Sequence, residues 1–284
     1  MTVADDIRTV IARQVLLDAL QALRSHRPAL VVVGAQAVYL HTGSGDLAIA
    51  AYTFDGDLAL DPTLLDDDPL LEQVMSDAGF SLMQRAGHDE PGTWVTSRRA
   101  GSEDIRFPVD LIVPEAFAPR GGRRSVQIGT HSKLALRRTH GLEAALVDCE
   151  TMRLTSLDPA DTRSIEVKVA GPAALMVAKL HKLHDRLEPG QRHDRQRDKD
   201  AADTYRLMQA FPPEGVAATL AALRNHPQAG GATDEAVTYL PQLFAGPRSP
   251  GTVMATSALR AIIPEARIRT VAGAWTQTVL AALA

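Results

Sequence analysis

The residue types best suited to chemistry are two aspartates separated by a single residue, Asp55 and Asp57, within the stretch 53–60. On a strand, residues two apart point to the same face, so these carboxylates would project side by side. Two carboxylates that close repel each other unless a cation lies between them. Mg²⁺ prefers hard oxygen ligands, often one or two carboxylates together with substrate phosphates. The spacing therefore favours a magnesium–nucleotide site, with an exposed turn at Gly56 as the alternative.

A third aspartate, Asp110, stands alone among apolar neighbours in the stretch 106–113. A carboxylate at the centre of an apolar strand is costly without a partner. A metal ion shared with Asp55 and Asp57 would supply that partner. A salt bridge, or an exposed face on an edge strand, would explain Asp110 equally well.

A glycine lies where a nucleotide phosphate would need close backbone approach. The apolar run 29–33 ends in Gly34 and Ala35, and 35–41 begins a helical pattern. A strand that runs through a small residue into a helix presents backbone amides to an anion. This junction is therefore a candidate phosphate contact.

The elements that must position these residues change in character along the chain. Strand patterns come first and helical patterns follow, which predicts an α+β core followed by a helical domain, divided near residue 170. The expected strands are 29–33, 53–60, 80–84, 93–97, 105–113 and 165–169, with a turn over 88–92. The expected helices are 4–25, 35–41, 66–78, 172–188, 196–210, 213–225, 232–244 and 267–283, with an exposed connection over 188–197.

Together, the Gly34-Ala35 junction, Thr53-x-Asp55-x-Asp57 and Asp110 resemble the polymerase-β-type nucleotidyltransferase fold. Two later motifs narrow the resemblance to the AbiEii family, the toxin halves of AbiE-type toxin–antitoxin systems. These motifs are Ala178-Lys179-Leu180 and Arg197-Asp198-Lys199-Asp200-Ala-Ala-Asp203. The resemblance covers roughly residues 30–210, and the last 70 residues carry no recognised motif.

The resemblance implies a nucleotidyltransferase-like catalytic domain over 1–170, with a mixed β-sheet core and flanking helices. A helical domain over 171–284 would contribute nucleotide-binding residues. In this scheme Asp55, Asp57 and Asp110 ligate Mg²⁺, and Asp110 also helps to deprotonate the attacking hydroxyl. The nucleotide-binding set is Gly34, Ala35, Lys179, Lys199 and Asp200, with Asp200 paired to Lys199 or Arg197.

The implied reaction transfers a nucleotide from a nucleoside triphosphate to an acceptor hydroxyl, with the 3′ end of transfer RNA as the expected acceptor. As a toxin, such a protein needs a neutralising partner, either an antitoxin protein encoded beside it or a kinase. The family usually has Gly-Gly or Gly-Ser where this chain has Gly34-Ala35. That departure leaves two alternatives open: a non-catalytic nucleotide- or RNA-binding module on the same fold, or transfer to a small molecule or a protein hydroxyl.

A local basic segment stands out in a chain of net charge −4. Residues 116–142 contain no Asp or Glu, and phosphate backbones bind such patches. The residues expected to contact RNA are Arg120, Arg123, Arg124, Arg137 and Arg138. The alternative is ordinary surface that pairs with neighbouring acidic regions.

Other polar residues have simpler interpretations. Lys179 and the 197–203 run would suit solvated helix faces, with Lys199 pairing to Asp203. His181, His184 and His193 lie close together, as in a histidine–aspartate phosphohydrolase. However, the remaining ligands of such a site are not evident, so a solvated face is the simpler interpretation.

Composition bounds the class of protein. Hydrophobic residues make up 45% of 284, ample for a core, and no apolar run approaches the 18 residues that a spanning helix needs. Cys149 is the single cysteine, which rules out an internal disulfide and fits a reducing cytoplasm. The sequence has no GxxxxGK[ST] motif, which excludes a P-loop ATPase. We therefore expect a cytoplasmic protein with no membrane partner.

Overall fold

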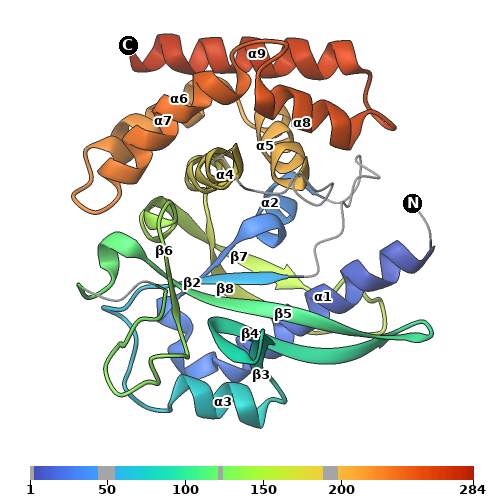
Figure 1. The fold of residues 1–284 in the computed structure, drawn as a ribbon, viewed down its shortest axis with the longest axis vertical. Helices are drawn as coiled ribbons and strands as arrows, with labels where there is room; N and C mark the ends of the chain where they lie inside the picture. The colour runs from blue at the N-terminus through green and yellow to red at the C-terminus, as the bar shows by residue number, and fades with distance from the viewer. Residues whose placement is uncertain (1–2, 44–54, 121–123, 188–197) are drawn as a thin grey trace. The chain divides into compact units, whose positions relative to one another are not determined.

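The computed structural model describes residues 3–43, 55–120, 124–187 and 198–284. It is a mixed α+β fold in which a mixed β-sheet core is followed by a C-terminal helical region (Figure 1). The chain divides into two compact units, which we call the sheet unit and the helical unit. The sheet unit comprises Met1–Gln36, Tyr52–Thr139 and Cys149–Val169, and the helical unit comprises Ala37–Ala51, His140–Asp148 and Ala170–Ala284.

The strands are β1 (Leu30–Val33), β2 (Gly56–Leu60), β3 (Ser81–Arg85), β4 (His88–Ala100), β5 (Glu103–Pro114), β6 (Arg137–Thr139), β7 (Cys149–Thr155) and β8 (Ser164–Ala170). The helices are α1 (Val3–Ala22), α2 (Gly34–Thr42), α3 (Leu71–Asp77), α4 (Pro172–Leu187), α5 (Asp198–Ala210), α6 (Pro213–Arg224), α7 (Gly230–Phe244), α8 (Pro250–Leu259) and α9 (Glu265–Leu283). Short 3₁₀ turns are η1 (Arg24–Ala29), η2 (Glu115–Phe117) and η3 (Glu143–Leu146).

The strands form one mixed sheet in the order β3-β4-β5-β2-β1-β8-β7, and β6 pairs with β5. The two central strands, β1 and β2, are antiparallel, while β2 with β5 and β1 with β8 are parallel pairs. Every residue of β1 and β2 is buried, because neighbours cover both faces of a central strand. A carboxylate on β2 is therefore held inside the sheet core.

Helix α1 supplies much of the core against the sheet. It packs on β2, β4 and β5. Its apolar side chains recur at helical spacing and are almost fully buried, including Val15, Leu16 and Leu20. Leu16 contacts Gly56, where an added Cβ would meet the Leu16 side chain at 3.1 Å. The amphipathic pattern seen in the sequence is thus used to cover the strand that carries Asp57.

The helical unit is built around α5, which contacts α4, α8 and α9. Residues 200–208 of α5 are all buried, although the segment begins with charged residues. α4 also packs on α7 and on η3, and α6 packs on α9. Because helix α5 is covered on every side, its polar residues need partners within the unit.

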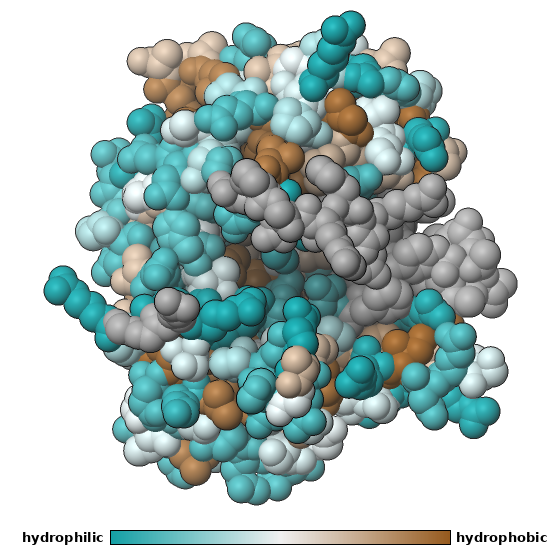
Figure 2. All heavy atoms as spheres, in the orientation of Figure 1, coloured by the Kyte–Doolittle hydropathy of each residue, from teal (hydrophilic) through white to brown (hydrophobic). Residues whose placement is uncertain are grey.

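The described surface carries scattered hydrophobic side chains. Exposed large hydrophobics come from both units, for example Ile7, Val147 and Val253. On the face drawn in Figure 2, brown hydrophobic residues lie among more numerous hydrophilic ones. Such isolated apolar residues are normal on folded proteins. Among the described helices, none has the length and apolar character needed to span a membrane.

Most expected elements are present, but several boundaries differ. The turn expected over 88–92 is wrong: β4 already begins at His88, and the chain reverses at Ala86 and Gly87, both with positive φ. The helix expected over 66–78 begins only at Leu71. Strands β6 and β7 and helix α8 were not expected, because β6 is short, β7 is largely exposed and α8 is rich in Gly, Ser and Thr. Residues 53–54 and the connection 188–197 lie outside the described residues.

Gly92 is a point where β4 requires glycine. Its φ is +70°, and an added Cβ would lie 2.4 Å from the backbone nitrogen of Arg137 and 2.6 Å from the carbonyl oxygen of Leu111. Its own N–H donates to the Leu134 carbonyl at 2.8 Å. The close approach of β4, β5 and β6 therefore depends on the missing side chain.

Gly92→Ala is expected to destabilise the protein more than Gly101→Ala. Both positions have positive φ, which costs an alanine about 1–2 kcal/mol. An alanine at 101 meets nothing within 4 Å, whereas at 92 it meets backbone atoms that cannot rotate away, adding about 1–3 kcal/mol. Denaturant unfolding of the two variants measures the difference. Equal losses would show that the strands move apart freely at Gly92.

Candidate active site

The central feature of the sheet unit is a pair of aspartates on neighbouring strands. β2 and β5 run parallel, and their register sets Asp57 directly opposite Asp110. Paired residues of adjacent parallel strands point to the same face, at a strand separation of about 4.8 Å. Asp57 is only 6% exposed, and the side chain of Asp110 is 18% exposed. Two acidic groups from distant segments are thus side by side in a largely buried position.

Asp55 lies just before this pair along the chain. It precedes the first residue of β2 and is half-buried. The strand expected from Thr53 onward is described only from Gly56, and Thr53 itself lies outside the described residues. Asp55 therefore lies immediately before the N-terminal end of β2, two positions before Asp57 in the chain.

Gly34 lies against Asp57 at the junction of β1 and α2. Its φ is +70°, and an added Cβ would fall 2.1 Å from Asp57 Oδ2. Only glycine leaves room for this carboxylate beside the first turn of α2. The first N–H groups of a helix have no partner within the helix and form its positive end. The carboxylate of Asp57 and the amide end of α2 consequently share one location.

A buried arginine, Arg13, holds the first turn of α2 in place through Gln36. Arg13 Nε donates to Gln36 Oε1 at 2.8 Å, and its Nη1 donates to the Thr155 carbonyl at 3.1 Å. Burial lowers the pKa of Arg13 to about 10, which still leaves it charged at neutral pH. The Gln36 Nε2 group is buried, and the structure gives it no hydrogen-bond partner among the described residues.

Asp110 is paired with Arg137, a partner that the motif pattern did not indicate. Arg137 Nη2 donates to Asp110 Oδ2 at 2.7 Å, and Nη1 donates to Thr139 Oγ1 at 3.0 Å. β6 carries Arg137 to this place because it pairs with the end of β5. The salt bridge left open as an alternative for Asp110 therefore exists. It occupies one carboxylate oxygen; the other, Oδ1, is buried without a hydrogen-bond partner in the described chain.

The other arginines expected to bind RNA differ in exposure. Arg120 and Arg124 are exposed, whereas Arg138 is half-buried and donates to the Pro119 carbonyl. Arg123 lies outside the described residues. Arg137 forms the salt bridge with Asp110. Two exposed guanidinium groups of the basic segment thus remain as surface candidates for a phosphate backbone.

In the helical unit, Lys179 forms a buried cluster with two aspartates. Lys179 Nζ lies 2.7 Å from Asp200 Oδ1 and 2.6 Å from Asp203 Oδ2, and Arg186 also pairs with Asp200. Lys179 and Asp203 are each no more than 3% exposed. The solvated faces considered for Lys179 and, within the run 197–203, for residues 200–203 are therefore wrong, while Arg197 lies outside the described residues. Asp200 pairs with Lys179 itself, and Lys199 is half-buried on the same helix.

Electrostatics keep this cluster charged despite its burial. Burial alone disfavours the charge on Lys179, but Asp200 and Asp203 outweigh it and hold the pKa of Lys179 above its usual value. Burial likewise works against the charged form of Asp200, yet Lys179, Lys182 and Arg186 hold its pKa below the usual range. The cluster thus joins α4 to α5 through full charges. A contact of Lys179, Lys199 or Asp200 with nucleotide stays a prediction.

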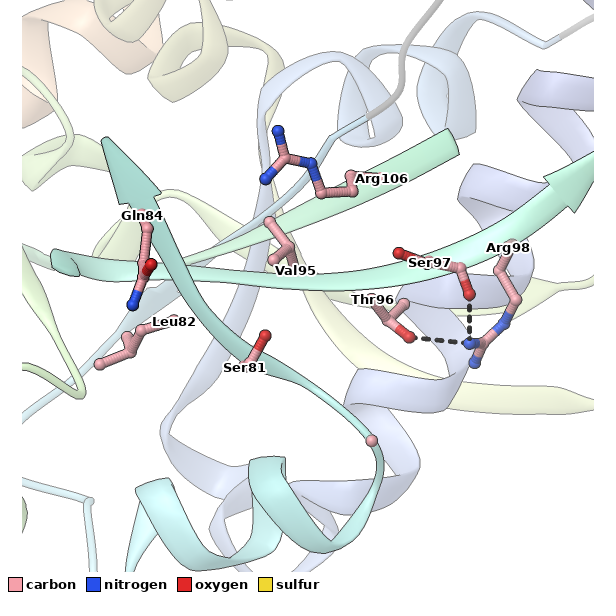
Figure 3. Close-up of a pocket in the computed structure, with 9 residues that line it drawn as sticks. Ser81, Leu82, Gln84, Val95, Thr96, Ser97, Arg98 and Arg106 are labelled. Atoms are coloured by element: carbon pink, nitrogen blue, oxygen red, sulfur yellow. Dashed lines mark hydrogen bonds between the residues drawn. The ribbon is translucent and has the colours of Figure 1, made fainter. Parts of the chain in front are cut away.

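An open groove on the sheet unit is lined by other residues (Figure 3). It has a volume of about 610 Å³ and is lined by Gly79, Ser81, Leu82, Gln84, Val95, Thr96, Ser97, Arg98 and Arg106. Arg98 is held by Thr96 Oγ1 at 2.7 Å and by Asp18 at 2.9 Å. None of the residues predicted for the site lines this groove, so it carries no part of the candidate active site.

Lys179→Met is expected to lower the free energy of unfolding by about 3–5 kcal/mol, because it leaves the carboxylates of Asp200 and Asp203 buried without their central cation. Lys182→Met removes the same charge from an exposed position on the same helix and should cost no more than about 1 kcal/mol. Guanidinium unfolding compares the two variants. Losses of equal size would contradict a buried ion cluster at Lys179.

Comparison with known proteins gave no match: no family model, no curated protein and no solved structure matches this chain. The likeness to the AbiEii family therefore rests on the motif residues themselves.

Proposed function

We propose that this protein is a magnesium-dependent nucleotidyltransferase, and that Asp55, Asp57 and Asp110 form its metal-binding centre. The observation that carries the proposal is the register of β2 and β5, which sets Asp57 beside Asp110 with Gly34 and the start of α2 against Asp57. Neighbouring carboxylates next to a helix N-terminus combine a cation site with an anion site. A metal-bound nucleotide requires both.

The donor set fits Mg²⁺. All the candidate ligands are carboxylate oxygens, which this hard cation prefers. Asp110 Oδ1 is buried and unpartnered among the described residues, a state that costs about 1–3 kcal/mol unless a ligand satisfies it. When bound, Mg²⁺ would neutralise the charge of the triphosphate and of the leaving pyrophosphate. Arg137 offsets part of the charge of Asp110 and holds its carboxylate in place.

The residues of the chain would bind and orient the substrates. The amides at the start of α2, from Gly34 and Ala35, would bind a phosphate oxygen. Gln36 Nε2, a buried donor with no partner in the described chain, belongs to the same turn. In the transfer, the acceptor oxygen forms a bond to the α-phosphorus and the α–β bridge bond breaks. The proton of the hydroxyl passes to Asp110.

The acceptor that we propose is the 3′ end of transfer RNA, and the biological role is that of a toxin with a neutralising antitoxin or kinase. The motif likeness to the AbiEii family supports this role. The exposed Arg120 and Arg124 lie on the same unit as the carboxylate pair and would contact the acceptor's phosphates. Lys179, Lys199 and Asp200 are proposed to contribute to nucleotide binding, as the family likeness implies.

A non-catalytic binding module is the second candidate. The observation that favours it is Ala35, which offers a backbone amide but no hydroxyl to a phosphate. The Asp110–Arg137 ion pair would then serve the sheet alone. Such a module would bind nucleotide or RNA but leave no label on any acceptor.

Asp57→Asn and Asp110→Asn should each abolish transfer of label from an α-phosphate-labelled triphosphate to transfer RNA, because each removes a carboxylate that binds the metal. We expect a loss of at least about 100-fold, on the scale of removing a key electrostatic group. Asp104→Asn is the matched control, since Asp104 lies exposed on the same strand as Asp110. Circular dichroism checks that each variant is folded.

The same assay separates the candidate functions. Label on transfer RNA supports the proposal, and label on protein or on a small molecule redirects it to another acceptor. Nucleotide binding with no labelled product would favour the binding module. Full activity in a folded Asp57→Asn protein would refute the metal assignment.

Reversal of charge at Arg120 and Arg124 tests the acceptor surface. Arg120→Glu with Arg124→Glu should raise the KM for transfer RNA at least tenfold and leave the KM for the triphosphate nearly unchanged, because the two arginines would contact only acceptor phosphates. The matched control is Arg85→Glu with Arg153→Glu, two exposed arginines of the same unit. Equal effects of the two double variants would contradict a specific acceptor role for the basic segment.

A further inference from the structure

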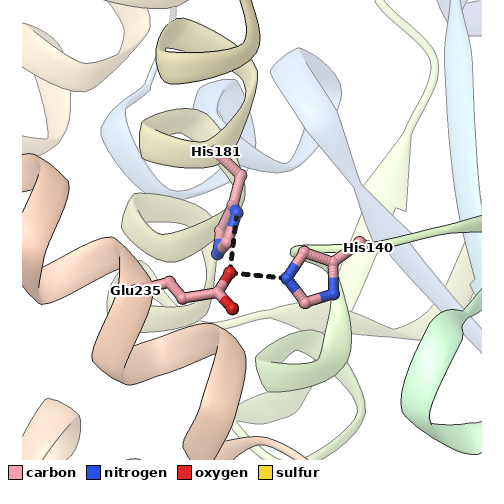
Figure 4. Close-up of side chains that lie close together, drawn as sticks. All are labelled: His140, His181 and Glu235. Atoms are coloured by element: carbon pink, nitrogen blue, oxygen red, sulfur yellow. Dashed lines mark hydrogen bonds and ion pairs between the residues drawn. The ribbon is translucent and has the colours of Figure 1, made fainter.

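Two histidines and a glutamate, His140, His181 and Glu235, lie close together in the helical unit (Figure 4). His140 comes from the loop before η3, His181 from α4 and Glu235 from α7. One ligand atom from each residue lies within 4.8 Å of the others. His140 Nε2 is 2.7 Å from Glu235 Oε2, and His181 Nδ1 is 3.9 Å from the same oxygen. Three elements thus aim donor atoms at one point.

The far nitrogen of each ring is held by another group, which fixes how the rings face. His181 Nε2 lies 2.8 Å from the Ala232 carbonyl, and His140 Nδ1 lies 3.5 Å from Glu143 Oε1. A carbonyl oxygen only accepts, so His181 Nε2 carries the hydrogen, and in the neutral ring Nδ1 presents a lone pair toward Glu235. At 3.9 Å this nitrogen is too far from Glu235 for a hydrogen bond. A lone pair facing a carboxylate leaves a place suited to a cation.

The supporting groups are themselves buried and anchored. Glu143 is 1% exposed, and its Oε2 accepts the Gly141 N–H at 2.7 Å. Gly141 has φ +86°, and an added Cβ would lie 2.5 Å from the His181 ring, so glycine is needed for this approach. Metal-binding histidines in proteins usually have their second nitrogen held by a carboxylate or a backbone carbonyl. Both forms of support are present here.

We infer that His140, His181 and Glu235 bind a zinc ion. Two imidazoles and one carboxylate form a donor set that suits Zn²⁺ and leaves a coordination position open. Because two donors are nitrogens, the site differs in chemistry from the all-oxygen set at Asp55, Asp57 and Asp110. The bound ion would join α4 and α7 to the loop before η3. This inference does not depend on the proposed nucleotidyl transfer.

The test is zinc binding by full-length protein freed of metal with a chelator. Isothermal titration with ZnCl₂, in excess Mg²⁺ to occupy the carboxylate site, should give one equivalent with a dissociation constant in the micromolar range or tighter. Glu235→Gln and His140→Ala should each weaken that binding at least tenfold. Substitution with Co²⁺ should give a visible absorption band, and each variant should lose it.

Matched controls lie next to the cluster. Asp234→Asn changes the neighbouring acid on α7, which pairs with Arg224, and His184→Ala changes the next histidine on α4. Both should bind zinc as the parent protein does. The inference is overturned if the parent binds no zinc, or if folded Glu235→Gln and His140→Ala variants bind it undiminished. Loss in Asp57→Asn alone would likewise overturn it, by placing the zinc at the carboxylate pair.

Discussion

The sheet unit depends on stabilising two neighbouring, largely buried carboxylates, which the register of β2 and β5 brings together. Setting Asp57 opposite Asp110 brings two acidic groups together in a mostly buried place, where repulsion and desolvation both oppose folding. The surrounding residues reduce this unfavourable free energy in several ways. Arg137 neutralises one carboxylate, Gly34 makes room for the other, and the positive end of α2 lies beside it. The one oxygen of Asp110 left without a partner in the described chain is where a cation would complete the balance.

The helical unit also buries polar groups, in two clusters that differ in how fully their members are paired. Lys179 pairs with Asp200 and Asp203 inside the unit, and Arg186 adds a second positive charge at Asp200, so the charges of this cluster are compensated and join α4 to α5. At His140, His181 and Glu235 the contacts are looser, because His181 Nδ1 lies 3.9 Å from Glu235 Oε2, beyond hydrogen-bond distance of the carboxylate that it faces. The first cluster has the character of a structural ion network, and the second that of a ligand site.

The residues that resemble the AbiEii family fall in both units. The proposed metal ligands Asp55, Asp57 and Asp110 belong to the sheet unit, where Asp57 and Asp110 lie side by side. The proposed nucleotide-binding residues Lys179, Lys199 and Asp200 belong to the helical unit, where Lys179 is paired with two aspartates. The segments 37–43 and 140–148 belong to the helical unit although the sequence places them among the strands. The helical unit therefore includes segments from both sides of residue 170.

The sequence by itself determined the elements with strong local patterns: the apolar run of β1, the periodic helices α1, α4, α5 and α9, and the spacing of Asp55 and Asp57 at the start of β2. Local periodicity suffices there because burial repeats with the period of the element. Only the tertiary structure decided the strand register that pairs Asp57 with Asp110, the arrival of Arg137 on the short strand β6, and the meeting of His140, His181 and Glu235. These depend on contacts between residues far apart in the chain, which no local pattern encodes.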